Sequence, residues 1–137
     1  MSRGMAMGFA RLINPGVVLH PELQQKIAVF EAMGAERSQL ESDLGRLRRK
    51  QEETEDNLAD ALAEDEFQCN LHGQEYTGPG EEELQDILKR HLGGIIEKLA
   101  AKYERIIYLD GDIRKLKGTI EKAIAVANEE SAAAASQ

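Results

Sequence analysis

Few residues in this chain are of a type and spacing that could do chemistry. Cys69 and His72 have the C-x2-H spacing that supplies two ligands to a zinc ion, but a structural zinc site needs four and no second pair lies nearby. The stretch Asp110–Asp112 (DGD) is similar to the start of a calcium loop, but Lys115 occupies the sixth position, where that loop needs glycine. We therefore predict no metal site and no cofactor.

Catalytic motifs are also missing from the sequence. No nucleophile motif, glycine-rich phosphate loop or metalloprotease helix occurs, and His20, His72 and His91 fall in three different segments. His91 lies beside an apolar helical stripe, where we expect an interface histidine. An isolated coiled coil offers no concave pocket of the size that a substrate needs. We predict that the protein is not an enzyme and has no catalytic residues.

The composition indicates long helices rather than a compact α/β domain. Of 137 residues, 42% are hydrophobic and 31% charged, but only 4% are aromatic and tryptophan is absent. A formal net charge of −8 argues against nucleic acid as the main partner, since phosphate binding needs clustered Lys and Arg. A single cysteine excludes an internal disulfide framework, and no apolar run is long enough to cross a bilayer.

Two long helices must position every other feature of the chain. The clearer of the two is indicated by a heptad pattern over residues 88–127. Apolar residues there recur alternately four and three positions apart, and only Lys102 interrupts them. Such a narrow stripe makes a helix supercoil against another helix. The series is Leu88, Leu92, Ile95, Leu99, Ile106, Leu109, Ile113, Leu116, Ile120, Ala123 and Ala127. We predict that its members from Leu88 to Ile120 form a partner-binding seam.

A second row of apolar residues widens this stripe. Ile96, Tyr103, Ile107 and Ile124 lie beside the strict heptad positions. Their presence predicts that this helix contacts more than one other helix.

The whole chain is predicted to be all-α, a long antiparallel helical hairpin or coiled coil with an extended N-terminal segment. We expect an extended or short-helical segment at 1–20, a coiled-coil helix at 21–66, a loop at 67–80, a second coiled-coil helix at 81–130 and a flexible tail at 131–137. Pro21 is favoured in a first helical turn, and the glycines and proline of 67–80 end the helical pattern. Gln51 and Thr54 make the first helix polar at core positions.

The N-terminal segment differs from the rest because it carries no acidic residue before Glu22. We predict that its apolar residues dock in a groove on a partner, with an unstructured tail and an organelle-targeting peptide as the other interpretations. The docking residues are Met5, Met7, Phe9, Leu12 and Ile13.

Charge on the first helix is divided into blocks. Arg46, Arg48, Arg49 and Lys50 form a basic cluster, and the range 52–66 contains eight acids and no base. Such a run is typical of a solvated helix face, and the alternative is a contact surface for a basic partner.

The helix–loop–helix outline resembles the prefoldin subunits, in which two coiled-coil arms flank β-hairpins. The segment 67–80 is short for the barrel of that family, and we identify no alternating strand pairs in it. Small ciliary and centrosomal coiled-coil proteins also look like this chain, but their Leu, Glu and Lys content is generic. The sequence therefore assigns no family.

The sequence predicts a non-enzymatic structural or scaffold subunit whose helices pack against other coiled-coil proteins in a larger assembly. We expect no nucleic acid partner, no membrane insertion and a cytoplasmic location, with the cytoskeleton, and the axoneme of a cilium in particular, as the leading site. Two alternatives stay open: an acidic coiled-coil chaperone or adaptor that binds a basic client, and a homodimeric coiled coil.

Overall fold

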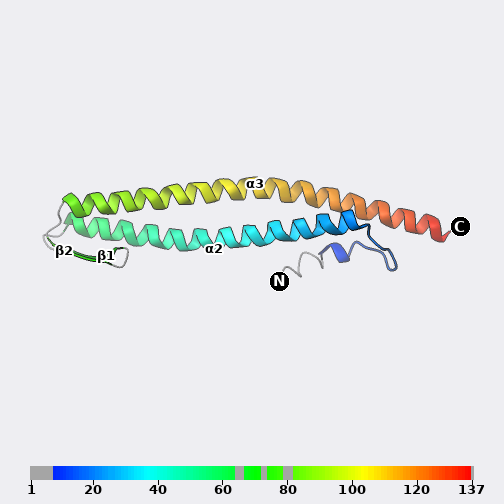
Figure 1. The fold of residues 1–137 in the computed structure, drawn as a ribbon, viewed down its shortest axis with the longest axis horizontal. Coiled ribbons are helices and arrows are strands. Elements are labelled where there is room, and N and C mark those ends of the chain that lie inside the picture. Colours follow the sequence, from blue (N-terminus) through cyan, green and yellow to red (C-terminus); the bar gives the residue numbers. More distant parts are fainter. Residues whose placement is uncertain (1–7, 64–66, 72–73, 79–81, 137) are drawn as a thin grey trace. The chain divides into compact units, whose positions relative to one another are not determined.

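Two long helices and a small sheet make up the described part of the chain. The computed structural model describes residues 8–63, 67–71, 74–78 and 82–136. In chain order the elements are α2 (Pro21–Ala63), β1 (Phe67–Leu71), β2 (Gln74–Gly78) and α3 (Glu82–Ala135), drawn in Figure 1. The chain divides into two compact units, Met1–Leu40 with Arg105–Gln137 (unit 1) and Glu41–Glu104 (unit 2), and each is described by itself.

The two long helices pack against each other, as predicted. In unit 2, Ala61 of α2 forms a buried cluster with Leu84 and Leu88 of α3, and Leu58 and Ile87 pack against it. Ala61 contributes only a methyl group, so that α3 can approach α2 closely here. The supercoil geometry of a coiled coil stays a prediction.

Unit 1 has a larger core of the same kind. Leu23 and Phe30 of α2 cluster with Ile120 and Ile124 of α3 and with Phe9 from the N-terminal segment. This cluster combines residues of both helices with Phe9, an aromatic residue that lies outside the two helices. Core formation in unit 1 therefore involves three segments of the chain.

Helix α2 begins at Pro21, as the sequence predicts. The carbonyl oxygen of His20 accepts hydrogen bonds from the backbone N–H groups of Leu23 and Gln24, at 3.0 and 3.1 Å. Proline suits the first helical position because the N–H that it lacks would have no partner inside the helix. Glu22 adds a negative charge beside the positive end of the helix dipole.

Further along α2, the predicted polar interruption of the core is present. Thr54 is buried, and its hydroxyl donates to the Lys50 carbonyl at 2.7 Å. This bond within the helix satisfies a polar group that would otherwise be buried without a partner.

Helix α3 ends later than predicted, because it continues past 130 to Ala135 and so includes most of the segment 131–137 that was predicted to be a flexible tail. The segment contains four consecutive alanines, and alanine has the highest helix propensity of all residues. Propensity therefore extends the helix past the last heptad residue, although these side chains are exposed.

The prediction of a loop throughout 67–80, and with it a purely helical fold, also needs correction. Strands β1 and β2 pair antiparallel, with Phe67 opposite Gly78 and Leu71 opposite Gln74. The sequence carries the signal, since Phe67, Cys69 and Leu71 alternate with polar residues and only two residues separate the strands. The glycines and the proline near the end of the segment predict a loop, and this signal outweighs the short alternating pattern.

Candidate interaction surfaces

The heptad seam of α3 lies in the interior of both units. Five of its nine predicted partner-binding residues are buried and the other four are half-buried. The buried residues are Leu88, Ile95, Leu99, Leu109 and Ile120, and the half-buried ones are Leu92, Ile106, Ile113 and Leu116. Ile113 and Leu116 pack against the core that unit 1 builds with α2. The first partner of this seam is therefore α2 of the same chain.

The second apolar row of α3 is divided between core and surface. Ile124 is buried, whereas Ile96 and Ile107 keep 47% and 71% of their surface exposed. Tyr103 is also exposed, and the guanidinium carbon of Arg48 lies 5.1 Å from the centre of its ring. That distance allows a cation–π contact, which links α2 and α3 at the surface of unit 2. The exposed isoleucines are available for contact with another chain.

The N-terminal segment packs on its own chain. Phe9 is only 4% exposed, and its ring lies edge-on to that of Phe30 with 5.0 Å between the centroids. Ile13 packs against the same core, while Leu12 is 46% exposed. Met5 and Met7 lie outside the described residues. Phe9 and Ile13 are thus already occupied, and docking of this segment on a partner stays a prediction.

Asn128 of α3 holds the backbone of this segment. Its side-chain amide donates to the Leu12 carbonyl at 2.8 Å, and its side-chain oxygen accepts from the Asn14 N–H at 3.0 Å. An asparagine side chain can both donate and accept, so one residue satisfies two backbone groups that no helix pairs. Phe9 supplies the apolar contact and Asn128 the polar contact that fix the segment in unit 1.

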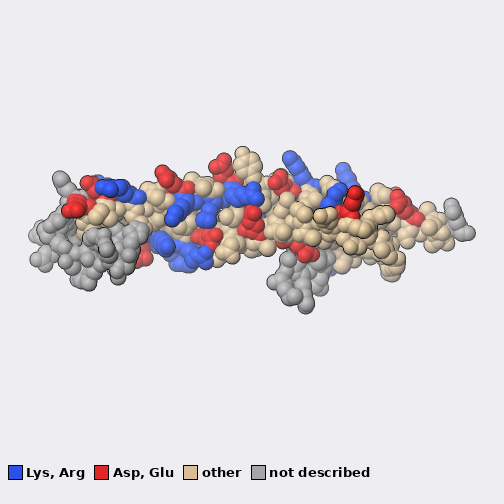
Figure 2. Space-filling view, in the orientation of Figure 1, with Lys and Arg blue, Asp and Glu red and all other residues tan. Residues whose placement is uncertain are grey.

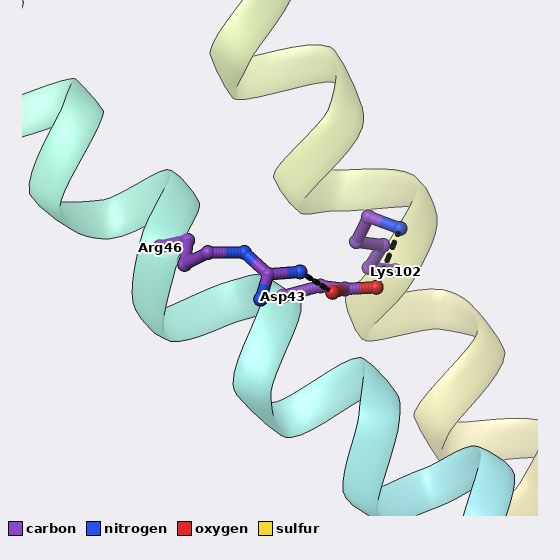
Figure 3. A network of polar contacts seen from close by, with 3 residues as sticks. All are labelled: Asp43, Arg46 and Lys102. Carbon is purple, nitrogen blue, oxygen red and sulfur yellow. Dashed lines mark hydrogen bonds and ion pairs between the residues drawn. The ribbon is translucent and has the colours of Figure 1, made fainter.

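Lys102, the residue that interrupts the heptads, faces an acid of α2. Its ammonium lies 3.5 Å from one carboxylate oxygen of Asp43, and Arg46 pairs with the other oxygen. Figure 3 shows both cationic side chains directed at this carboxylate, one from each helix. Asp43 therefore offsets part of the positive charge that Arg46 and Lys102 bring to the helix–helix contact of unit 2. The heptad pattern located Lys102 but gave no indication of its partner.

Two ion pairs join the helices in unit 1. Arg105 donates to both carboxylate oxygens of Glu36 at 2.9 and 3.1 Å, and Arg37 donates to Asp110. The hydrogen bond from Arg105 lowers the pKa of Glu36, and the same contact raises the pKa of Arg105. A two-oxygen contact of this kind fixes the orientation of both side chains, although exposed pairs contribute little stability.

The DGD stretch, which the sequence predicted not to bind calcium, lies in α3 beside Arg37. The Asp110 carboxylate is occupied by the guanidinium group of Arg37, and α3 is helical throughout 110–112. Among the described residues, no three potential metal ligands gather in one place. The described helices also contain no apolar stretch long enough to cross a membrane.

Basic side chains border two hollows on the surface of unit 2. One, of about 250 Å³, is lined by Asp43, Arg46, Leu47, Lys50, Lys98 and Lys102. The other, of about 400 Å³, is lined by Ile87, Arg90, His91, Gly94, Ile95 and Lys98. Lys98 borders both. Sequence reasoning identified the cluster 46–50 but did not bring it together with the basic residues of α3, because that requires the pairing of the two helices.

Comparisons with known proteins add no relative. No family model matches the chain, and comparison with curated proteins and with solved structures found no match.

Proposed function

We propose that this chain is a non-enzymatic subunit of a multi-chain assembly, and that the β1–β2 sheet is one of its joints. The sheet has two strands in the part of the chain that the structure describes. An isolated two-stranded hairpin is only marginally stable in water, and each outer edge carries backbone N–H and C=O groups that can pair with another strand. Pairing with strands of another chain would satisfy those edges. This observation carries the proposal.

The helices support the same proposal in a second way. Ile107 and Tyr108 of α3 are 71% and 63% exposed. Large apolar residues adjacent in sequence and open to water are favoured sites for contact with another chain. Packing of this face against partner helices is the mode that the sequence predicted, and it is compatible with strand pairing.

Two variants separate the two modes. Replacement of residues 67–78 by a Gly/Ser linker of equal length removes the strands and keeps both helices. The I107S/Y108S variant keeps the strands and removes the apolar pair of α3. Native mass spectrometry of the affinity-purified chain from its source then gives the mass of the assembly. We expect the linker variant to lose the partners and I107S/Y108S to retain some. Retention of every partner by both variants would overturn the proposal.

A chaperone subunit is the second candidate, and the β-hairpin specifically favours it. The order helix–hairpin–helix is the outline in which the chain resembles prefoldin subunits. Strands β1 and β2 supply the hairpin that sequence reasoning did not predict. The described acids of the run, Glu52, Glu53, Glu55, Asp56 and Asp60, are all exposed. They would hold a basic client by charge.

Suppression of the aggregation of a basic unfolded protein tests this candidate. The variant E53Q/D56Q/D60Q should lose suppression, while E121Q/E129Q/E130Q removes equal charge from unit 1 and should keep it. Suppression by the acidic surface should also fall as salt screens it. Equal activity of both variants would contradict the candidate.

Three points stay predictions. They are a location in the cytoskeleton or a cilium, assembly as a homodimer, and the absence of enzyme activity. A mass measurement on the purified chain separates the homodimer from the single chain.

A further inference from the structure

We propose that the basic groove of unit 2 binds an acidic peptide segment of a partner protein in an extended conformation. The basic groove comprises the two hollows that meet at Lys98. It is distinct from the strand edges and from the acidic run, so this proposal does not depend on the proposed function.

The charge of the groove is positive although its surroundings are acidic. Residues 41–104 carry seventeen acidic and eight basic side chains. Five of those eight bases line the groove, namely Arg46, Lys50, Arg90, Lys98 and Lys102. Asp43 is the one acid among the lining residues. On the face seen in Figure 2, basic side chains gather in places along a surface that also carries many acids. A negatively charged ligand would therefore be attracted to the groove and repelled around it.

Three of these cations remain for a ligand, and two of them line the smaller hollow. Asp43 is engaged by Arg46 and by Lys102. In the described part of the chain, none of Lys50, Arg90 and Lys98 forms an ion pair. Lys50 and Lys98 are both exposed, and they line the smaller hollow from different helices. An acidic side chain lying in this hollow would gain contact with both ammonium groups.

The length of the groove indicates an extended ligand rather than a small anion. The twelve steps along α3 from Arg90 to Lys102 span about 18 Å at a rise of 1.5 Å per residue. An extended peptide covers that length with about five or six residues, at about 3.3 Å each. A phosphate-sized anion would contact only one or two of the cations.

Apolar residues line both hollows and indicate that the bound peptide also carries apolar side chains. Leu47 lies in the smaller hollow, and Ile87 and Ile95 in the larger one. Side chains of an extended peptide point alternately to opposite sides, so acidic and apolar residues in turn could meet the cations and this apolar surface. No aromatic side chain, on which a nucleic acid base would stack, lines either hollow. The groove therefore fits an acidic, partly apolar peptide better than a nucleic acid.

Fluorescence anisotropy with a dye-labelled octapeptide of alternating Glu and Leu tests the proposal on the full-length protein. The K50E/K98E variant reverses the two unpaired charges of the smaller hollow, and K115E/K122E makes the same change in net charge at exposed positions of unit 1. We expect K50E/K98E to weaken binding at least tenfold and K115E/K122E less than twofold. The milder variant K50Q/K98Q should lie between them, and far-UV circular dichroism checks that each variant remains helical.

Three results would overturn the proposal. The first is equal weakening by K50E/K98E and K115E/K122E, which would reduce binding to net charge. The second is tighter binding of a labelled single-stranded oligonucleotide than of the peptide. The third is self-association in sedimentation that K50E/K98E abolishes, because the groove would then hold a second copy of this chain.

Discussion

The contact between Phe9 and Phe30 permits a sharp test of where the N-terminal segment docks. Both side chains are almost fully buried, with 4% and 6% exposure. Truncation of a buried phenylalanine to alanine costs about 3 to 5 kcal/mol. We expect F9A to lower the free energy of unfolding by about 3 kcal/mol, because the segment can partly relax, and F30A by about 4 kcal/mol.

A double-mutant cycle then isolates the aromatic pair. An edge-to-face pair at this distance contributes about 0.5 to 1.5 kcal/mol beyond the burial of its surface. The F9A/F30A variant should therefore lose less than the sum of the two single variants, by about 0.5 to 1.5 kcal/mol. Purely additive losses would mean that the two rings do not touch in solution.

Urea unfolding followed by circular dichroism at 222 nm measures these differences, since both units are helical. With a slope of about 1.5 kcal/mol/M, a loss of 3 kcal/mol lowers the midpoint by about 2 M. L12A is the matched control, because Leu12 belongs to the same segment and is half exposed; its midpoint should change by less than about 0.3 M. A midpoint for F9A equal to that of L12A, or one that varies with protein concentration, would refute docking on the same chain.

Four further variants test three other contacts. L88A should cost about 3 kcal/mol in the same urea titration, because Leu88 is completely buried in the core of unit 2; a loss below 1 kcal/mol would contradict that burial. K102L should change the free energy of unfolding by less than about 1 kcal/mol, whereas D43L should lower it by about 2 kcal/mol. Only D43L leaves two cations, Arg46 and Lys102, without their carboxylate. Equal losses for the two variants would argue against this pairing. Arg105 lowers the pKa of Glu36, so its stabilising effect is present above the ordinary glutamate pKa and is lost as the pH falls through the lowered value. E36Q should therefore flatten the acid side of a plot of stability against pH, and an unchanged plot would show that the pair does not form in solution.

The helical part of the fold was predictable because its signals are periodic and repeated. The heptads of 88–127 and the proline at 21 located two long helices and the start of the first. The ends of the elements were less certain, because alanine propensity prolonged α3 and a short alternating pattern produced β1 and β2 where glycines predicted only a loop. Short elements carry few residues, so that each pattern has little statistical weight.

The candidate surfaces were harder to predict, because contact between distant segments is needed to form them. A buried Phe9 and an exposed Leu12 look alike in the sequence, and only Phe30 and Asn128 on two different helices distinguish them. The basic cluster 46–50 likewise borders a groove only once Lys98 lies beside it.

Lys102 and Asp43 show how one interruption of a pattern can fix an arrangement. A lysine at a heptad position destabilises a helix–helix contact unless an acid lies opposite, and it therefore disfavours any register that offers none. In unit 2, Asp43 is the residue that meets this requirement. A shift of α3 by one heptad relative to α2 would leave the apolar stripe of α3 in phase, because that stripe repeats every seven residues. In one direction, however, the shift would bring Lys102 to the level of Lys50, where two cations would repel each other. The apolar stripe thus supplies most of the stability of the contact, while the single charged position disfavours a register that the stripe alone would allow.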